Sequence, residues 1–274
     1  MMKKQTLLSL LLLLVCMMWA SSVSAGVEIR WVKYTKTGYI TGEGITGSVH
    51  YDAENKVLTL DNAHITFDNA HITPANSVLK NEDDGLKLVV KGDCSLTCED
   101  DGFYAILSDC PMTITGGGTL TIEIRGAAIG KFNNDPMRLT IEGCTVVAHG
   151  SDYGIVGNPI STLVIRNATV KAQGTQYGSI MQWGDIKLEG CKIEQPADAT
   201  FGEDWAGKHV MKDGAVVKSE VVIVPDATGI AHPTTDAPTP KDGVYTLDGV
   251  YLGTHVESLP RGVYIVGGKK VIKN

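Results

Sequence analysis

Short stretches in which hydrophobic and polar residues alternate recur along the chain, and each of them ends at Gly or Asn. Alternation of this kind predicts a strand with one buried face. A Gly or Asn at its end predicts a corner at positive φ, a backbone state that these two residues reach at low cost. Six copies are present: Leu58–Asn62, Leu88–Gly92, Met112–Gly116, Leu139–Gly143, Leu163–Asn167 and Ile186–Gly190. Their first residues lie 30, 24, 27, 24 and 23 positions apart, and this regular period predicts a repeat architecture.

Further hydrophobic positions follow each copy at comparable distances. A second short strand is predicted after each corner, and it starts at Ile65, Leu96, Leu120, Val146, Val170 and Ile193. A third set of equivalent positions, 23, 26 and 25 residues apart, consists of Ile106, Ile129, Ile155 and Ile180. Three hydrophobic stretches per period predict a three-sided coil, and such coils stack about 4.8 Å apart to form a β-solenoid.

The long period distinguishes this fold from its main alternative, a β-sandwich of hairpins. Hairpins are typically marked by two-residue Asn-Gly or Asp-Gly loops at intervals of about 8–12 residues. Helical folds are disfavoured as well, because no stretch after residue 25 shows a sustained helical period. The sequence therefore predicts an all-β protein.

With these motifs the chain resembles the right-handed parallel β-helix proteins, over about residues 48–195. That group includes pectate-lyase-like enzymes and non-catalytic polysaccharide-binding solenoids. The lead-in formed by Ser48–Asp52 and Val57–Ala63 resembles the opening of secreted carbohydrate-binding β-helix domains that are common in Bacteroidetes. The resemblance implies a right-handed parallel β-helix of about six coils, and a polysaccharide or cell-surface glycan as the ligand.

Residues 1–25 have the features of a secretory signal peptide. Lys3 and Lys4 give a basic start, an apolar stretch follows, and Val23-Ser24-Ala25 is a small-residue cleavage site. A transmembrane anchor is the alternative, but the apolar stretch is short for a membrane span. We therefore expect an exported protein at the outer cell surface or in the extracellular space, with the periplasm as the alternative.

The charge of the chain disfavours two classes of partner. The formal net charge is −7, and loss of two lysines with the signal peptide changes it to about −9. An acidic product is a poor ligand for nucleic acid or for an anionic membrane surface. No other stretch is long and apolar enough to span a bilayer.

The segments outside the repeat suggest a domain order. Residues 26–47 are predicted to cap the open end of the β-helix, which covers 48–224, and the Pro- and Thr-rich residues 225–242 form a linker. Residues 243–274 are predicted to form a tail of small hairpins. This tail, with Leu259–Tyr264, resembles the sorting tails of the type IX secretion system, which implies the export machinery as a partner. The tail departs from that pattern, because it is short and lacks the usual Gly-Arg.

Five cysteines remain after the signal peptide, and an odd number prevents complete pairing within one chain. Cys144 and Cys191 hold equivalent places two coils apart, about 10 Å, which is too far for a disulfide. We interpret them as small buried corner residues. Cys94, Cys98 and Cys110 leave two alternatives open, one disulfide or a zinc site, although they lack the usual paired ligand spacing.

Aromatic side chains are the first candidates for carbohydrate binding, because a ring face covers the apolar face of a sugar. Tyr104, Tyr153 and Tyr177 lie at comparable coil positions. They form either a stacking platform or an inward structural ladder, since two of them lie two residues before an inward Ile. Trp183 and Trp205 lie where the coil pattern loosens and are predicted at the surface, where rigid scaffolds carry their binding loops.

Two acidic loops are candidates for binding Ca²⁺. They consist of Glu82, Asp83, Asp84 and of Glu99, Asp100, Asp101, and each ends in Gly. Ca²⁺ takes about six or more oxygen ligands from flexible turns, which two such loops on adjoining coils would supply. The alternative is a pair of solvated acidic loops.

No catalytic motif stands out. Glu142, Arg166 and Glu189 hold equivalent places in successive coils and are predicted to form an exposed ion ladder, while His149 stands alone in the sequence. Serine-hydrolase, metalloprotease and phosphate-loop motifs are missing. The sequence favours a secreted, non-catalytic polysaccharide-binding protein. A polysaccharide lyase or glycoside hydrolase with a site on the coil face and an adhesin-like structural protein are the alternatives.

Overall fold

The computed structural model describes residues 25–67, 77–131, 133–226, 243–246, 251–253, 255–266 and 269–273, without the side chains of residues 99–103, 251 and 258. The chain divides into two units, Met1–Ala227 and Thr228–Asn274, and each is described by itself. Residues 1–24 of the predicted signal peptide and 227–242 of the predicted linker lie outside the described part. No helix among the described residues has the length and hydrophobicity to cross a membrane.

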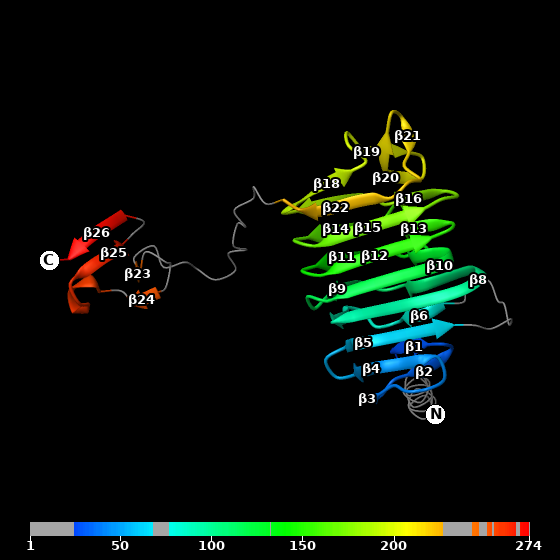
Figure 1. Cartoon of the computed structure of the whole chain (residues 1–274), viewed down its shortest axis with the longest axis horizontal. Coiled ribbons are helices and arrows are strands. Elements are labelled where there is room, and N and C mark those ends of the chain that lie inside the picture. Colours follow the sequence, from blue (N-terminus) through cyan, green and yellow to red (C-terminus); the bar gives the residue numbers. More distant parts are fainter. Residues whose placement is uncertain are drawn as a thin grey trace, which may run out of the picture. The chain divides into compact units, whose positions relative to one another are not determined.

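The first unit is a parallel β-solenoid, as the repeat predicts, and its strands lie above one another like rungs (Figure 1). The six repeated motifs form its first face, with β5 (Val57–Phe67), β7 (Leu86–Lys91), β9 (Met112–Thr115), β11 (Arg138–Glu142), β14 (Thr162–Arg166) and β17 (Asp185–Glu189) in parallel register. Leu88 aligns with Ile114, and Ile114 with Ile141, and all three are fully buried. Hydrophobic burial in this column offsets the cost of ordering each coil.

The second and third copies are not equivalent in the stack, contrary to the prediction. Leu88 aligns with Ile114 rather than with Met112, so the second and third copies are offset by two residues. The corners follow the same alignment, because Gly118 rather than Gly116 lies against Gly92 of the coil before it. On the second face the same offset aligns Leu96 with Ile122 instead of Leu120, whereas Leu120 and Val146 align as predicted.

The second and third faces complete a three-sided coil. They are formed by β6 (Ser77–Asn81), β8 (Asp93–Ser108), β10 (Thr119–Gly130), β12 (Thr145–Gly150), β13 (Tyr153–Val156), β15 (Thr169–Gly174) and β16 (Gly178–Met181). The long strands β5, β8 and β10 each run past a corner onto the next face. The predicted isoleucine column is confirmed, since Ile106, Ile129, Ile155 and Ile180 align and Leu79 extends it.

The predicted corners have the predicted backbone. All six end residues have positive φ, between 44° and 119°: Asn62, Gly92, Gly116, Gly143, Asn167 and Gly190. Gly reaches this conformation because it has no Cβ atom to meet the following carbonyl oxygen, and Asn tolerates it because its short polar side chain forms local hydrogen bonds.

The solenoid has about five turns, in line with the prediction of about six coils. The sixth copy contributes only β17 and β18 (Cys191–Gln195) to the stack. The strand β22 (Val221–Pro225) lies between β15 and β18 and is antiparallel to both. The returning chain thus occupies the place where β18 would otherwise stack directly on the fifth coil.

The N-terminal residues cover the first coil with antiparallel strands. β4 (Ile45–Asp52) pairs with β5, while β1 (Val27–Ile29) pairs with both β6 and β2 (Val32–Tyr34). The short β3 (Gly38–Tyr39) pairs with β4. Antiparallel cover of this kind occupies the hydrogen-bonding groups that an exposed terminal coil would offer to another chain.

Two small antiparallel sheets complete the fold. Beyond the last coils lies a sheet of β19 (Thr200–Asp204), β20 (Gly207–Lys212) and β21 (Ala215–Val216) (Figure 1). The second unit is a four-stranded sheet of β23 (Val244–Tyr245), β24 (Tyr251–Gly253), β25 (Gly262–Val266) and β26 (Lys269–Lys273), with a 3₁₀ turn at Val256–Ser258. This confirms the small β tail.

Candidate functional site

The tyrosines predicted at equivalent positions lie outside the core rather than in an inward ladder. On the third face several successive residues of a strand are buried, as Gly154, Ile155 and Val156 are in β13. Strict alternation therefore breaks, and Tyr153, two residues before Ile155, does not share its side of the strand. Tyr104 and Tyr153 instead pack in a separate cluster with Ala127, Val156, Met181 and Val216.

Tyr104, Tyr153 and Tyr177, named here the tyrosine patch, form one aromatic surface. Tyr153 and Tyr177 are stacked, with ring centroids 4.9 Å apart and ring planes 22° from parallel. Tyr177 is 46% exposed, and its hydroxyl accepts a hydrogen bond from Gln176 Nε2 (2.9 Å). Ala127 aligns with both Tyr104 and Tyr153, so these two lie two coils apart, about 10 Å along the solenoid.

The tyrosine patch packs on apolar side chains, and two acidic residues at its rim, Asp152 and Asp109, lie near Tyr104. A Cβ atom on Gly130 would lie 2.4 Å from Tyr104 Cε1, so only glycine leaves room for that ring. Burial raises the pKa of Tyr104, and the charges of Asp152 and Asp109 raise it further. Burial also raises the pKa of Tyr153, with contributions from the two neighbouring tyrosines. Both hydroxyls therefore remain protonated donors at neutral pH.

The two tryptophans predicted at the surface have opposite positions. Trp205 is 94% exposed in the turn between β19 and β20. Trp183 is completely buried, so its prediction as a surface residue is wrong. Its ring occupies the space above Gly157, where a Cβ atom would lie 2.5 Å from Trp183 Cδ2, and its backbone pairs with Lys208 of β20. The loosened sequence pattern marks the end of the stack, where this indole is enclosed.

The turn that carries Trp205 is held by a histidine–aspartate pair. Buried His209 accepts the Gln182 N–H at Nδ1 (3.1 Å), which leaves the proton on Nε2 for donation to Asp204 Oδ1 (2.8 Å). The same oxygen accepts the Ala206 N–H (2.7 Å). The hydrogen bonds from His209 and then Ala206 lower the pKa of Asp204. This pair fixes the turn that presents the indole to solvent.

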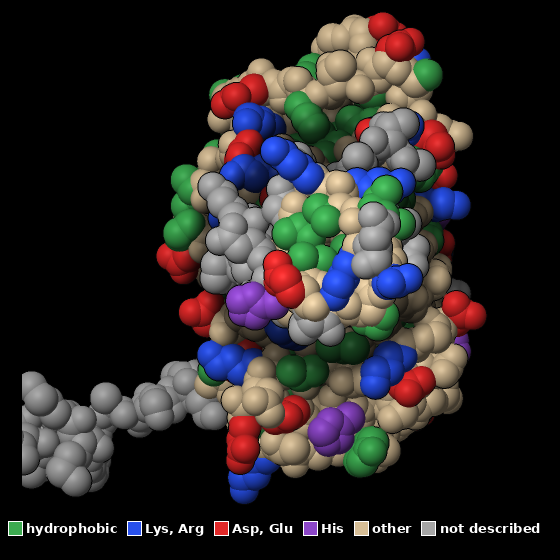
Figure 2. All heavy atoms as spheres, turned by 90° about the vertical axis from the view of Figure 1, so that its left-hand side faces the viewer, with side chains coloured by type: hydrophobic (Ala, Val, Ile, Leu, Met, Phe, Trp, Pro, Cys, Tyr) green, Lys and Arg blue, Asp and Glu red, His purple; other side chains and the backbone are tan. Residues whose placement is uncertain are grey.

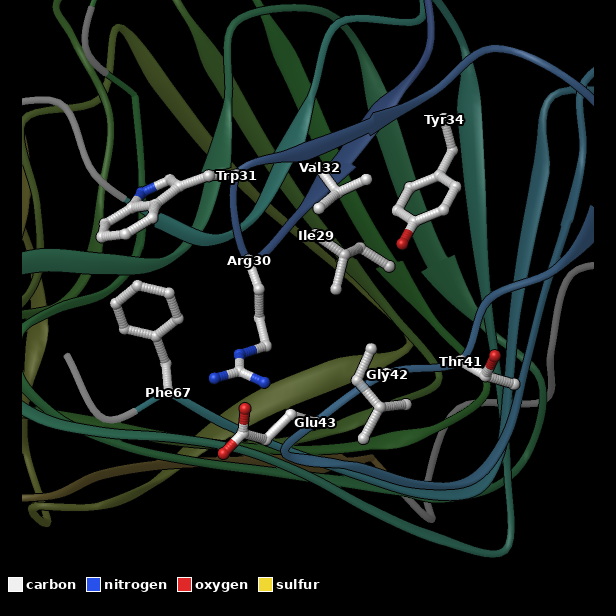
Figure 3. A pocket seen from close by; sticks show the side chains of 10 residues that line it. Ile29, Arg30, Trp31, Val32, Tyr34, Thr41, Gly42, Glu43 and Phe67 are labelled. Atoms are coloured by element: carbon white, nitrogen blue, oxygen red, sulfur yellow. The ribbon is translucent and has the colours of Figure 1, made fainter.

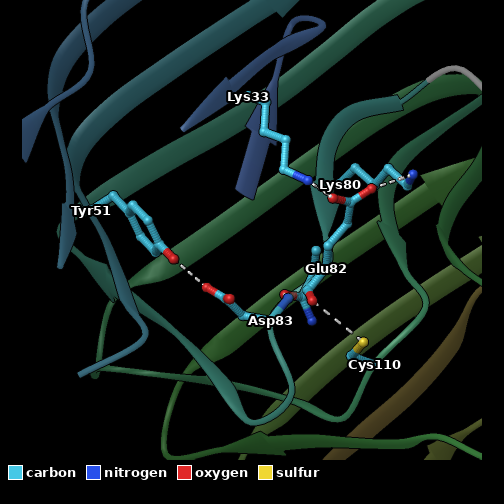
Figure 4. A network of polar contacts seen from close by, with 7 residues as sticks. Lys33, Tyr51, Lys80, Glu82, Asp83 and Cys110 are labelled. Carbon is cyan, nitrogen blue, oxygen red and sulfur yellow. Dashed lines mark hydrogen bonds and ion pairs between the residues drawn. The ribbon is translucent and has the colours of Figure 1, made fainter. Parts of the chain in front are cut away.

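The first acidic loop already has protein partners (Figure 4). Glu82 lies between Lys33 Nζ (2.5 Å) and Lys80 Nζ (2.7 Å). Burial alone would raise the pKa of Glu82, but the two lysines outweigh it and lower that pKa. Asp83 is buried and accepts a hydrogen bond from the Tyr51 hydroxyl. The two ammonium groups disfavour a divalent cation at Glu82.

The remaining residues predicted to bind Ca²⁺ are less constrained. Asp84 is exposed, and its backbone carbonyl accepts a hydrogen bond from Lys56 Nζ (2.9 Å). The side chains of Glu99, Asp100 and Asp101 lie outside the described residues. Among the described side chains, no three His, Cys, Asp or Glu residues are arranged to hold a metal ion. The Ca²⁺ site stays a prediction.

The five cysteines after residue 25 are free thiols, so the disulfide alternative for Cys94, Cys98 and Cys110 is wrong. Cys94 and Cys98 lie four residues apart on one strand, about 13 Å, which exceeds disulfide reach. Cys110 lies beyond the third face, with its thiol 3.6 Å from the Glu82 carbonyl. Cys144 is buried and Cys191 partly buried at their corners.

The charged residues of the coil face form two bridges between coils. The predicted ion ladder is confirmed, because Arg166 contacts Glu142 (3.2 Å) and Glu189 (2.6 Å) on either side. His149, which stands alone in the sequence, has Glu123 Oε1 3.0 Å from Nδ1 and Glu220 Oε2 2.9 Å from Nε2. Sequence reasoning missed the contact between His149 and Glu220 because Glu220 is 71 residues away along the chain.

Sequence reasoning also missed a pocket at the N-terminal end of the solenoid (Figure 3). The turn between β1 and β2 and the end of β5 line this pocket, with Arg30, Trp31, Glu43 and Phe67 among its residues. The sequence predicts only a capping role for residues 26–47. The signal that would have revealed a second role is an Arg-Trp pair at a turn where Asn-Gly would be expected.

On the face shown in Figure 2, acidic and basic side chains are interspersed. The fold and the tyrosine patch define the protein as a parallel β-solenoid with a partly exposed aromatic surface. Comparison with known proteins adds no relative, because no protein-family model, no curated protein and no solved structure matches the chain.

Proposed function

We propose that this protein is an exported, non-catalytic polysaccharide-binding solenoid, and that the tyrosine patch is its binding surface. The stacked Tyr153–Tyr177 pair beside Tyr104 carries this proposal. The ring of Tyr177, which precedes β16, is held against the ring of Tyr153 on β13, so little conformational entropy is lost when a sugar chain packs against the pair. The tyrosine hydroxyls and the acidic rim supply hydrogen-bonding groups for sugar hydroxyls.

The charged groups of the coil face favour binding over turnover. An acid–base pair for glycoside cleavage needs carboxyl groups available to the substrate. Glu142 and Glu189 instead share Arg166, and Asp185 contacts Lys208 Nζ at 2.6 Å. Arg166 lies between two carboxylates, which suits an ion ladder better than the base of a lyase.

The test compares matched tyrosine variants of residues 26–274 by affinity electrophoresis in gels that contain neutral or acidic polysaccharides. We expect retardation by at least one polysaccharide, lost when Tyr153 and Tyr177 are both changed to Ala and kept when both are changed to Phe. Tyr39→Ala is the control, since Tyr39 is 75% exposed outside the patch. Equal retardation of the Ala variant, or none of the parent, would refute the proposal. New reducing ends or unsaturated products would favour the enzyme alternative.

Two further parts of the proposal have their own tests. The Bacteroidetes resemblance, the signal peptide and the tail 243–274 support export to the cell surface, which fractionation of cells with and without the tail will test. The second acidic loop, Glu99 to Asp101, supports a requirement for Ca²⁺. Titration calorimetry with millimolar Ca²⁺ should then give a binding heat, and polysaccharide retardation should fall with chelator.

A further inference from the structure

The turn between β1 and β2 has a backbone that its residues do not favour. Ile29 pairs with Val32, so Arg30 and Trp31 alone form the turn, and both have positive φ, 49° and 66°. A two-residue turn of this type strongly prefers Asn-Gly. The six corners of the solenoid follow that preference, because each positive-φ position there is Gly or Asn. Lys56, in the turn between β4 and β5, also has positive φ (53°), so the β1–β2 turn is distinguished by having two such side chains in succession.

The two side chains at this turn are directed to one place. The Trp31 ring meets the Phe67 ring edge to face, with centroids 4.8 Å apart and planes at 80°. The Arg30 guanidinium carbon lies 5.6 Å from the centre of the same Phe67 ring. Trp31 is nevertheless 36% exposed, so one part of the indole remains open to solvent. Unfavourable backbone conformations persist where side chains have a role, and they are frequent at binding sites.

These side chains border a pocket of about 190 Å³. Pockets for drug-sized ligands measure roughly 300–1,000 Å³, so this one admits a single ring-sized group. Its floor contains Phe67 and Ile29, while Tyr34 and Thr41 add hydroxyl groups. In Figure 3 the Arg30 guanidinium and the Glu43 carboxylate point toward each other on one side of the pocket, apart from the Trp31 ring.

The charges of the pocket select the class of ligand. An anionic ligand would lie beside Glu43, and a cationic ligand would lie beside Arg30, so both are disfavoured. Adjacent hydroxyl groups of a neutral sugar suit this pair, because each hydroxyl both donates and accepts hydrogen bonds while Arg only donates and a carboxylate accepts. The exposed part of the Trp31 ring is available to the apolar face of the sugar.

We infer that this pocket binds one neutral sugar ring, at the end of a saccharide chain. The inference extends the proposed function, since it takes the ligand to be a saccharide, but it concerns a site separate from the tyrosine patch. The patch would hold the interior of a chain, whereas the pocket, at the first coil of the solenoid, would hold a chain end.

The test follows the indole N–H signal of Trp31 by NMR in a protein of residues 26–274, and the Trp31→Phe variant assigns this signal. Methyl glycosides of glucose, galactose, mannose and xylose are then added in turn. We expect at least one neutral glycoside to shift this signal, and glucuronic acid and glucosamine to leave it unmoved. The Trp205 indole signal serves as the internal control. Glu43→Gln should weaken binding about tenfold, because it removes a charged acceptor.

A second variant separates binding from packing. Arg30→Asn combined with Trp31→Gly gives the turn its preferred residues, so we expect an unchanged or higher melting temperature together with loss of glycoside binding. A clear fall in melting temperature would show that the two side chains serve packing and would overturn the inference. It would also be overturned if no neutral glycoside, or the charged sugars equally, shifted the Trp31 signal. Retardation that survives in the Tyr153→Phe, Tyr177→Phe protein would leave the proposed function standing in that case.

Discussion

Gly143, at the corner between β11 and β12, allows the backbone cost of one solenoid corner to be measured alone. Its φ is +60°, and a Cβ atom added there would meet no other atom within 4 Å. Gly143→Ala therefore costs only the left-handed conformation, about 1–2 kcal/mol. For a chain of this size each kcal/mol lowers the melting temperature by about 2–4 °C, so we expect a fall of about 2–8 °C.

Two matched variants complete the experiment. Gly143→Asn should be close to neutral, because Asn62 and Asn167 hold the same place in other coils at φ 45° and 44°. Gly118→Ala tests the opposite effect: the φ of Gly118 lies outside the positive region, but a Cβ atom there would lie 2.5 Å from the Gly92 carbonyl oxygen. Backbone must then move, at a cost of about 1–3 kcal/mol.

Thermal and urea unfolding followed by circular dichroism will give the four stabilities. The reasoning would be refuted if Gly143→Ala and Gly143→Asn had equal stability, since the corner would then not depend on φ. An unchanged Gly118→Ala protein would likewise contradict the close stacking of the second and third coils.

Three further predictions concern charge and burial. Glu82→Gln should lower stability at pH 7 by up to about 1 kcal/mol, because Glu82 loses its ion pairs with Lys33 and Lys80. The pKa of Glu82 is lowered on folding, so its contribution to stability is present above its ordinary pKa of about 4.3 and is lost as the pH falls through the folded pKa. Urea titrations from pH 7 to 3 should therefore show the unfolding free energies of the parent and of Glu82→Gln converging. Burial raises the pKa of Cys144 to about 11, so about 0.1% of its thiol is ionised at pH 8. Iodoacetamide should therefore label Cys144 readily only in urea. Rapid labelling of Cys144 in the folded protein would contradict its burial. Arg166→Gln breaks two half-exposed ion pairs and should cost about 1 kcal/mol or less, with a smaller difference in high salt; a loss of several kcal/mol would mean that the ladder is part of the packing.

Local pattern was enough to predict the repeating scaffold. A corner at Gly143 or Asn167 depends on its own residue and on the strand before it, so its backbone could be predicted from a few residues. The isoleucine column and the Arg166 ladder were predictable because stacked coils place equivalent residues beside each other. The three members of the tyrosine patch could be named for the same reason.

The sides and partners of other residues depended on contacts between distant segments. Alternation breaks at Gly154 and Ile155, and Tyr153 packs outside the main core, although strict alternation would place it inside. Enclosure by the last coil and β20 buried Trp183, and no local signal marked that enclosure.

The sequence by itself thus determined the stacked, three-sided coil, because each period repeats the same alternating hydrophobic residues and the same Gly or Asn corner. Only the tertiary structure decided how many coils are complete, since β22 enters between β15 and β18. It also brought Glu220 to His149 and set Trp31 against Phe67 to form the end pocket. These contacts join residues that lie dozens of positions apart, and no local pattern of hydrophobic and polar residues encodes which distant segments will meet.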